Sequence, residues 1–251
     1  EVNEGVGGAI AAGYEWARDN DVDMAVVMAG DGQMNPDDMP ALLDPVVDDG
    51  VNYSKANRLI VNRAVDKVPF VRFFGNSVLS LLTKISSGYW HISDSQPGYT
   101  VADKDVLHTI EWQDMYKRYG QPNDLLIKLN VHNFIVRDVP TEPVYNVGEK
   151  SGIKVRKVIF TISNILVKGF FWRMKHKYII RDFHPLVLFY MLGLLLGFIG
   201  TLFLVRCLWV LIATGSAPLI STVTMFFMYT TGLQCIFFGM LFDMQDNRNL
   251  R

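Results

Sequence analysis

Cysteine is scarce in this chain of 251 residues, which contains only Cys207 and Cys235, both in or beside apolar segments. A disulfide framework is therefore not expected, and nothing indicates an oxidising compartment. The sequence also lacks a P-loop and a dinucleotide-binding fingerprint. Its five histidines show no metal-ligand spacing with one another or with cysteine, which favours packing roles. Because no basic patch with interleaved aromatic residues is present, we expect no nucleic-acid partner.

The chain opens, without a start methionine, inside a segment of helical pattern, Gly5 to Arg18, and we expect no signal peptide in it. A short buried strand at Met24–Met28 and a second helix at Met39–Val47 follow, the latter after the acidic pair Asp37-Asp38, which suits a helix N-terminus. This alternation predicts an α/β fold. At least one βαβ unit, roughly 30 residues or more, is expected in front of Glu1, so we expect the chain to be a fragment.

A carboxylate on a glycine-rich turn follows the strand directly, in the run Ala29-Gly-Asp-Gly-Gln33. Ligands of open α/β sheets bind beyond the carboxyl ends of strands, which is where Asp31 is placed. Asp31 and Gln33 can both point at one hard cation, because Gly30 and Gly32 allow the backbone to turn sharply. The run therefore indicates a Mg²⁺ or Mn²⁺ site with Asp31 and Gln33 as ligands. A solvated surface turn is the alternative, since turns containing Asp and Gly are common.

Charge and hydropathy divide the chain into two parts. Residues 1–150 carry 13 Lys and Arg against 22 Asp and Glu, whereas residues 151–251 carry 11 against 3. The second part contains two charge-free apolar stretches of 20 and 24 residues, Leu186–Val205 and Leu219–Phe242. Each is long enough to span a bilayer. The short connection between them predicts a transmembrane hairpin. Basic residues precede the first stretch and follow the second, so the positive-inside rule predicts that both ends, and the catalytic domain, lie in the cytoplasm.

The first apolar stretch contains a small-xxx-small pair, Gly193 and Gly197, with Gly200 close behind. Such spacing allows helices of one chain, or of neighbouring subunits, to approach closely, so a homo-oligomer is compatible with the sequence. The alternative is that glycine is merely tolerated in a membrane helix.

Segment 154–170, between the predicted soluble domain and the first apolar stretch, has a helical period. Its apolar positions are Val155, Val158, Ile159, Ile162, Ile165 and Leu166. Such a helix can lie in the headgroup plane, with Phe170–Trp172 at the interface and Arg173 and Lys175 near anionic lipid. The alternative is an amphipathic helix that packs on its own domain. The membrane segments that follow favour the interfacial interpretation.

A set of short motifs occurs in one order between Glu4 and Lys154. They are Glu4-Gly-Val-Gly-Gly-Ala-Ile-Ala-Ala-Gly13, Ala29-Gly-Asp-Gly-Gln33, Lys55-Ala-Asn-Arg58, Gly75-Asn76, Ser87-Gly-Tyr-Trp90, Asp94-Ser-Gln-Pro-Gly-Tyr99 and Ser151-Gly-Ile-Lys154. This ordered set resembles the inverting glycosyltransferases of family 2, in particular the dolichol-phosphate mannosyltransferase-like branch. The resemblance implies a GT-A (Rossmann-like) fold, a nucleotide-sugar donor, a divalent metal and a polyprenyl-phosphate acceptor.

The resemblance also assigns expected roles to the first loop. A metal held by Asp31, with Gln33, would neutralise the charge that builds up on the departing nucleoside diphosphate. In the family this loop commonly reads Asp-x-Asp, and here Ala29 stands at the first position. The departure removes one carboxylate, which alters metal affinity or donor contact unless another group compensates.

Further expected roles fall on residues outside this loop. Arg58 and Arg72 resemble the family's acceptor-phosphate arginines, with Lys55 and Asn57 nearby, and a planar guanidinium suits phosphate. Asp94 resembles the family aspartate that faces sugar and acceptor, although an ordinary Asx turn is its alternative. The resemblance also implies a donor-binding set of Gln33, Gln96 and Lys154.

The sequence therefore predicts four segments and one activity. The segments are 1–150, a GT-A domain without its N-terminal portion; 151–184, amphipathic juxtamembrane helices; 185–242, two transmembrane helices; and 243–251, a cytoplasmic tail. The predicted activity is transfer of a sugar to polyprenyl phosphate by an integral membrane protein. The alternatives are a transferase with another lipid acceptor and a non-catalytic membrane adaptor that has kept the fold, for which Ala29 is the motivating residue.

Overall fold

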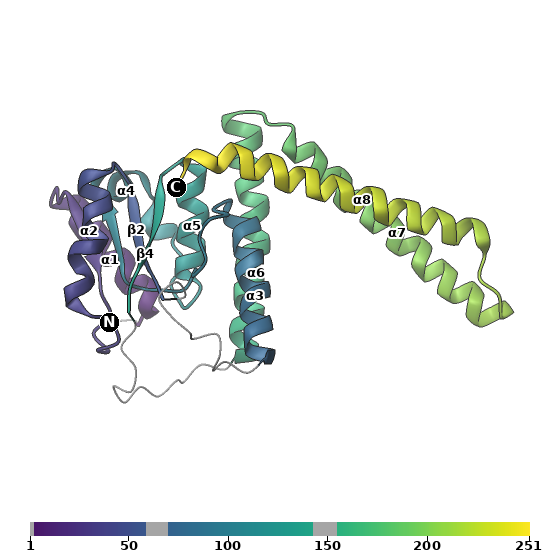
Figure 1. Ribbon diagram of the computed structural model, residues 1–251, viewed down its shortest axis with the longest axis horizontal. Coiled ribbons are helices and arrows are strands. Elements are labelled where there is room, and N and C mark those ends of the chain that lie inside the picture. The colour runs from purple at the N-terminus through teal and green to yellow at the C-terminus, as the bar shows by residue number, and fades with distance from the viewer. Residues whose placement is uncertain (1–2, 59–69, 143–154) are drawn as a thin grey trace. The chain divides into compact units, whose positions relative to one another are not determined.

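The computed structural model describes residues 3–58, 70–142 and 155–251, and for residues 70–77 and 155–159 it describes the backbone alone. The chain divides into two compact units, Glu1–Arg173 with Asn247–Arg251, and Met174–Asp246. A sheet with flanking helices makes up the first unit (Figure 1). Its elements are α1 (Gly5–Asp19), β1 (Met24–Val27), η1 (Pro36–Asp38), α2 (Met39–Asp48), β2 (Tyr53–Asn57), α3 (Phe70–Ser87), β3 (Thr100–Asp103), α4 (Lys104–Thr109), η3 (Trp112–Asp114), α5 (Gln121–Val131), β4 (Val136–Pro140), most of α6 (Val155–Lys175) and η5 (Asn247–Asn249).

The described strands form one mixed sheet in the order β1-β3-β2-β4. β3 is antiparallel to both β1 and β2, and β2 is parallel to β4. Consequently β1, β2 and β4 run in the same direction, and their carboxyl ends meet the amino end of β3 at one edge. In the register, Lys55 of β2 lies opposite Asp138 of β4 and Thr100 of β3. The predicted α/β class is confirmed in the form of a mixed sheet.

Helices cover both faces of this sheet, and the strands lie between α2 and α5 (Figure 1). On one face, Leu42 of α2 packs against Ala56, Val101 and Val139. On the other face, α1, α4 and α5 contribute to a larger core. Its most deeply buried large side chains include Tyr14, Tyr89, Leu107, Trp112, Leu125 and Leu129. Because strand residues alternate between the faces, Lys55, Asn57 and Asp138 lie on the α5 side of the sheet.

The three elements predicted near the start of the chain are present with shifts of one residue at their ends. The predicted helix Gly5–Arg18 is α1, the predicted strand is β1 and the predicted helix Met39–Val47 is α2. Asp37 and Asp38 do lie at a helix N-terminus, where Asp38 is the N-cap residue of α2, but the Asp38 side chain makes no cap bond there. Asn35 instead accepts a hydrogen bond from the Asp37 backbone N–H at 3.1 Å. The cap therefore forms one short turn earlier, in front of Pro36.

The helix predicted between the two parts is α6, and its described apolar positions face its own unit. Ile162 and Leu166 are buried against Ile127 of α5. Gly169 allows this approach, because an added Cβ would meet the Ile127 side chain. The apolar stripe thus packs on its own domain, which is the alternative left open by the sequence. Other positions of the helix expose large apolar side chains, namely Phe160, Val167, Phe171 and Trp172.

The second unit consists of the π-helix η4 (His176–Arg181) and two long helices, α7 (Leu186–Thr214) and α8 (Leu219–Asp246). Both helices are long and apolar enough to cross a membrane, and the mean hydropathy over an 18-residue stretch is 2.4 in the first and 1.5 in the second. Most of their large apolar side chains are exposed. A soluble monomer rarely exposes so much contiguous apolar surface.

Glycines form the contact between α7 and α8. A Cβ added at Gly193 would lie 2.8 Å from the Gly232 carbonyl oxygen, and one added at Gly239 would lie 3.1 Å from the Tyr190 ring. Gly200 faces the Tyr229 ring in the same way. The predicted close approach through small residues is therefore used within one chain.

The last residues of the chain return to the first unit. Asn130 Nδ2 donates to Asn247 Oδ1 at 2.7 Å, and the Val136 N–H donates to the Leu250 carbonyl at 3.2 Å. Arg173, the last residue before the second unit, donates through Nη1 to Asn130 Oδ1 at 3.3 Å. Asn130 therefore holds both the segment that leaves the sheet domain and the segment that comes back.

The compact units group the chain differently from the four predicted segments. Segment 151–184 is divided at Arg173, because α6 packs on the sheet domain. The tail 243–251 is divided as well, because residues 247–251 pack there too. Boundaries drawn from hydropathy follow composition, whereas compact units follow packing.

Gly88 ends α3 in a left-handed conformation and provides a stability test. Its φ is +78°, and an added Cβ would lie 3.1 Å from Arg173 Cζ. The Arg173 guanidinium donates to the Ser86 carbonyl at 2.9 Å, so a displaced guanidinium would lose this bond. Gly88→Ala is therefore expected to lower the free energy of unfolding by about 2 kcal/mol, measured by denaturant unfolding of the detergent-solubilised protein.

The matched control for Gly88 is Gly13→Ala in the middle of α1. Apart from the neighbouring backbone of α1 itself, no atom of the described residues lies within 4 Å of a Cβ added there. Because alanine is the better helix former, this variant is expected to be neutral or up to about 1 kcal/mol more stable. Equal stability of Gly88→Ala and the parent protein would contradict the close packing of the Arg173 guanidinium against Gly88.

Candidate functional site

Polar side chains gather at the sheet edge where β1, β2 and β4 end and β3 begins. The turn Asp31–Gln33 follows β1, Arg58 follows β2 directly, and the segment Asp94–Gln96 precedes β3. Since β3 runs opposite to its neighbours, the segment before β3 reaches the same edge as the residues after them. Ligands of α/β sheets bind at this edge.

A pocket with a cavity volume of about 60 Å³ lies there. Its wall includes Gln33 after β1, Arg58 after β2, Tyr99 before β3 and Glu142 after β4. A drug-sized ligand needs roughly 300 Å³ or more. The described residues therefore enclose room for a small polar group, such as one phosphate, and not for a whole nucleotide sugar.

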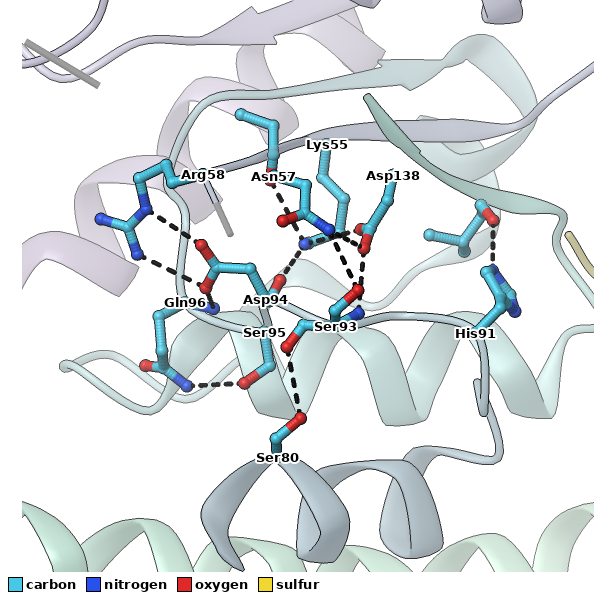
Figure 2. A network of polar contacts seen from close by, with 12 residues as sticks. Lys55, Asn57, Arg58, Ser80, His91, Ser93, Asp94, Ser95, Gln96 and Asp138 are labelled. Atoms are coloured by element: carbon cyan, nitrogen blue, oxygen red, sulfur yellow. Dashed lines mark hydrogen bonds and ion pairs between the residues drawn. The ribbon is translucent and has the colours of Figure 1, made fainter. Parts of the chain in front are cut away.

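Arg58 and Asp94 form a two-pronged ion pair at this pocket (Figure 2). Arg58 Nε donates to Asp94 Oδ2 at 3.0 Å, and Nη2 donates to Oδ1 at 3.4 Å. The Asp94 side chain is 6% exposed and that of Arg58 is 43% exposed. The Asp94 carboxylate thus lies in the protein interior, while the Arg58 guanidinium borders the pocket. Two parallel bonds set the plane of the guanidinium, which suits it to receive a phosphate or carboxylate.

A second, buried ion pair lies beside the first (Figure 2). Lys55 Nζ donates to Asp138 Oδ1 at 3.0 Å, and Asn57 Nδ2 donates to Asp138 Oδ2 at 2.6 Å. The Lys55 and Asp138 side chains are only 2% and 8% exposed. Lys55 and Asn57, which the sequence placed beside the phosphate-binding arginines, therefore face the interior. Asp138 joins this group although sequence reasoning did not single it out.

Asp31 lies on an exposed turn next to the pocket. Its Oδ1 accepts a hydrogen bond from the Gln33 backbone N–H at 3.1 Å, and Gly32 has a φ of +75°. This is an Asx turn on the surface, which agrees with the solvated surface turn that the sequence left open as the alternative here. The Gln33 side chain lines the pocket. An Asx turn uses one carboxylate oxygen, so it does not preclude a ligand at the other.

The fit of a divalent metal to this turn depends on how many ligands the protein supplies. Within the parts of the chain that are described, no group of three His, Cys, Asp or Glu could hold a metal ion. Mg²⁺, however, is usually bound through one or two carboxylates together with substrate phosphates and waters. Asp31 with Gln33 fits a site of this second kind.

The sequence predicts three further residues at the site, namely Gln96, Arg72 and Lys154. Gln96 Nε2 donates to Ser95 Oγ at 3.0 Å and to Asn123 Oδ1 at 3.3 Å, so its side-chain amide is directed toward α5. Arg72 lies in the first turn of α3, but its guanidinium is outside the described side chains. Lys154 is outside the described residues altogether.

Asp138 shows what sequence reasoning missed and why. The available signal was an acidic residue within Val136-Arg-Asp-Val-Pro140, a short strand pattern in which positions 136, 138 and 140 share a face. An acidic residue on a buried face needs a cationic partner. That partner, Lys55, lies 83 residues earlier in the chain, and only the register of β2 with β4 brings the two together.

The chain is also similar in sequence to two known proteins. No protein-family model matches the chain. The chain is 31% identical over 145 residues to the UDP-N-acetylglucosamine–dolichyl-phosphate N-acetylglucosaminyltransferase of Methanococcus voltae, which covers 58% of this chain and 57% of that protein. It is 25% identical over 144 residues to an uncharacterized protein of Methanocaldococcus jannaschii, covering 57% of this chain and 59% of that protein. The chain therefore spans less than three fifths of the length of these curated relatives, one of which is a dolichyl-phosphate sugar transferase.

Proposed function

We propose that the chain belongs to a membrane-bound, inverting glycosyltransferase of family 2, with a GT-A fold, that moves a sugar from a nucleotide sugar to dolichyl or undecaprenyl phosphate. The observation that carries the proposal is the Arg58–Asp94 ion pair at a pocket that Gln33 also lines. The similarity to a dolichyl-phosphate N-acetylglucosaminyltransferase supports a polyprenyl-phosphate acceptor. Because that relative is named for N-acetylglucosamine, the similarity does not favour mannose as the sugar.

Arg58 is assigned to the acceptor phosphate, together with Arg72. A phosphate monoester has a second pKa of about 6 and is largely a dianion at pH 7, so it is a nucleophile without a general base. The guanidinium that Asp94 holds in place offers its outer edge to such a phosphate. Asp94 thereby acts on the acceptor through Arg58, since its carboxylate is buried and holds the guanidinium through both oxygens.

The proposed reaction is a single displacement at the anomeric carbon. An acceptor phosphate oxygen forms the new bond to the sugar carbon while the bond from that carbon to the diphosphate oxygen breaks. The bonding electrons leave with the nucleoside diphosphate, and no proton needs to move. Attack opposite to the leaving group inverts the anomeric configuration.

The donor diphosphate is assigned to the side of the pocket formed by the Asp31 turn. A Mg²⁺ or Mn²⁺ ion bound there would supply charge neutralisation for the leaving group. Asp31 would offer its exposed carboxylate to that ion, and Gln33 its side-chain amide oxygen. Gln96 and Lys154 remain proposed donor contacts, the former with a side chain that would have to turn away from Asn123.

The membrane part follows from the two long helices. α7 and α8 are proposed to span the bilayer as a hairpin, because they are long, apolar and mostly exposed. The basic residues around them support a cytoplasmic position for the sheet domain, which stays part of the proposal. Phe160, Val167 and Phe171 of α6 are exposed apolar side chains that suit the lipid interface. A homo-oligomer stays a prediction, and Gly197, with open space around its Cβ position, is a small residue that could serve it.

The test is a transfer assay with the full-length protein in membranes. Labelled nucleotide sugars are supplied one at a time with dolichyl or undecaprenyl phosphate, and label in the organic phase is measured with Mg²⁺, with Mn²⁺ and with chelator. Metal-dependent labelling of the lipid from at least one donor is expected. Transfer only to another lipid would favour the alternative acceptor, and inertness with every donor would favour the adaptor, for which Ala29 and the single carboxylate at the turn are the motivating observations.

A further inference from the structure

The buried ion pair between Lys55 and Asp138 needs a reason beyond stability. Removing two charges from water costs several kcal/mol per ion, and hydrophobic replacements of such pairs are often neutral or stabilising. The pair is nevertheless held at a register position between β2 and β4, with side-chain exposures of 2% and 8%. Its other hydrogen bonds show what it does.

These hydrogen bonds fasten the backbone of two consecutive residues, Ser93 and Asp94 (Figure 2). The Ser93 N–H donates to Asp138 Oδ2 at 3.0 Å, and Lys55 Nζ donates to the Asp94 carbonyl. Asn57 Nδ2 reaches both Asp138 Oδ2 and Ser93 Oγ, the latter at 3.2 Å. The segment before β3 is therefore tied to β2 and β4 at the residue whose carboxylate holds Arg58.

Arg58 depends on this support more than a buried side chain would. Its side chain is 43% exposed, and among the described residues it is Asp94 that accepts the hydrogen bonds of its Nε and Nη2. An arginine side chain carries about 2 kcal/mol of rotamer entropy, which a fixed partner removes before the ligand arrives. If the Asp94 backbone shifted, its carboxylate would no longer hold the Arg58 guanidinium in one orientation.

We propose that Asp138, together with Lys55, is a positioning residue for the lipid phosphate: the buried pair fixes the Ser93–Asp94 backbone, and Asp94 in turn orients the Arg58 guanidinium that receives the phosphate. This inference rests on the proposed function. It adds a residue that contacts neither substrate and acts through two others. The effect belongs to the acceptor, because the donor side of the pocket is formed by the Asp31 turn.

The experiment compares Asp138→Asn with the parent protein in membranes, with KM measured separately for undecaprenyl phosphate and for the nucleotide sugar. Asparagine keeps one oxygen for the Ser93 N–H and Asn57 but leaves the Lys55 ammonium without its counter-ion. A rise of roughly tenfold or more in the acceptor KM is expected, with the donor KM within twofold. The double variant Lys55→Gln with Asp138→Asn, which restores a neutral hydrogen-bonded pair, is expected to recover most of the loss.

Asp49→Asn is the matched control, because it breaks the exposed ion pair that Asp49 makes with Arg137 on the same strand β4. It should change neither KM. Amide hydrogen exchange of the segment 88–96, which requires no catalysis, is measured in all variants. Faster exchange of this segment in Asp138→Asn, with α1 unchanged, is the expected structural counterpart.

The outcomes separate this inference from the proposed function. A folded Asp138→Asn protein with unchanged acceptor KM and unchanged exchange overturns the inference while leaving the transferase intact. Equal rises in both KM values, with exchange faster throughout the domain, also overturn it and indicate a purely structural pair. A parent protein that labels no lipid overturns the proposed function, and the acceptor assignment falls with it even if the exchange result holds.

Discussion

Replacing Arg58 by alanine is expected to lower kcat/KM for the lipid phosphate by about 10² to 10³ fold, because it removes the charged donors that meet the phosphate, each worth about 1.5–3 kcal/mol. Arg58→Lys should recover only part of this loss, since an ammonium keeps the charge but has no planar fork. The donor KM should change little. Steady-state kinetics in membranes with the two substrates varied independently measure all three values.

Arg137→Ala is the control for this substitution. Arg137 is 39% exposed, close to the 43% of Arg58, and it also pairs with an aspartate, Asp49. It does not line the pocket, so its loss should leave both KM values unchanged. An equal effect of the two substitutions on acceptor kinetics would show that surface charge, and not the fork at Arg58, controls the lipid phosphate.

Asp31→Asn is expected to abolish most transfer, with a loss of about 10³ fold or more, equal to about 4 kcal/mol of transition-state stabilisation. The substitution is selective, because asparagine retains the side-chain oxygen that accepts the Gln33 N–H. The turn therefore stays, while the negative charge that would hold a divalent cation is lost. A Mn²⁺ titration of activity should show a weaker apparent metal affinity in whatever activity remains.

Asp37→Asn is the companion control, since Asp37 is an exposed acid six residues further along the same segment. It should retain full activity and an unchanged metal requirement. If Asp31→Asn transferred sugar at the parent rate, or if the parent protein were insensitive to chelator, the assignment of the metal to this turn would be contradicted.

Local features of the site could be predicted from the sequence because they depend on near neighbours. The position of the Asp31 turn follows from a buried strand that ends in a glycine-rich run, and β1 ends within one residue of the predicted point. α1 and α2 follow from periodicity, and the two apolar helices from length and lack of charge. Each of these inferences uses fewer than 30 consecutive residues.

The partners of the site residues could not be predicted in this way. Lys55 and Asp138 are 83 residues apart in the chain, and Arg58 and Asp94 are 36 apart. Their pairing depends on β2 lying beside β4 and on β3 running in the opposite direction. For the same reason the sequence placed Lys55 with the phosphate-binding cations, although strand register turns its ammonium inward.

α6 shows a second limit of pattern reasoning. Periodicity predicts a helix with one apolar face, and the helix is present. Periodicity alone does not say whether that face meets lipid or protein. Contact of Ile162 and Leu166 with Ile127 decides for protein at those positions.

In the proposed reaction, the group that attacks the sugar is a phosphate on the lipid, which the Arg58 guanidinium receives. The most direct measurement of this step offers the parent protein equal amounts of polyprenyl phosphate and polyprenol in the same membranes with an accepted nucleotide sugar, and identifies the products by mass spectrometry. One product is expected, a lipid that carries the sugar and a single phosphate, with none formed from polyprenol. Glycosylated polyprenol, or transfer to both lipids at similar rates, would contradict the proposed reaction.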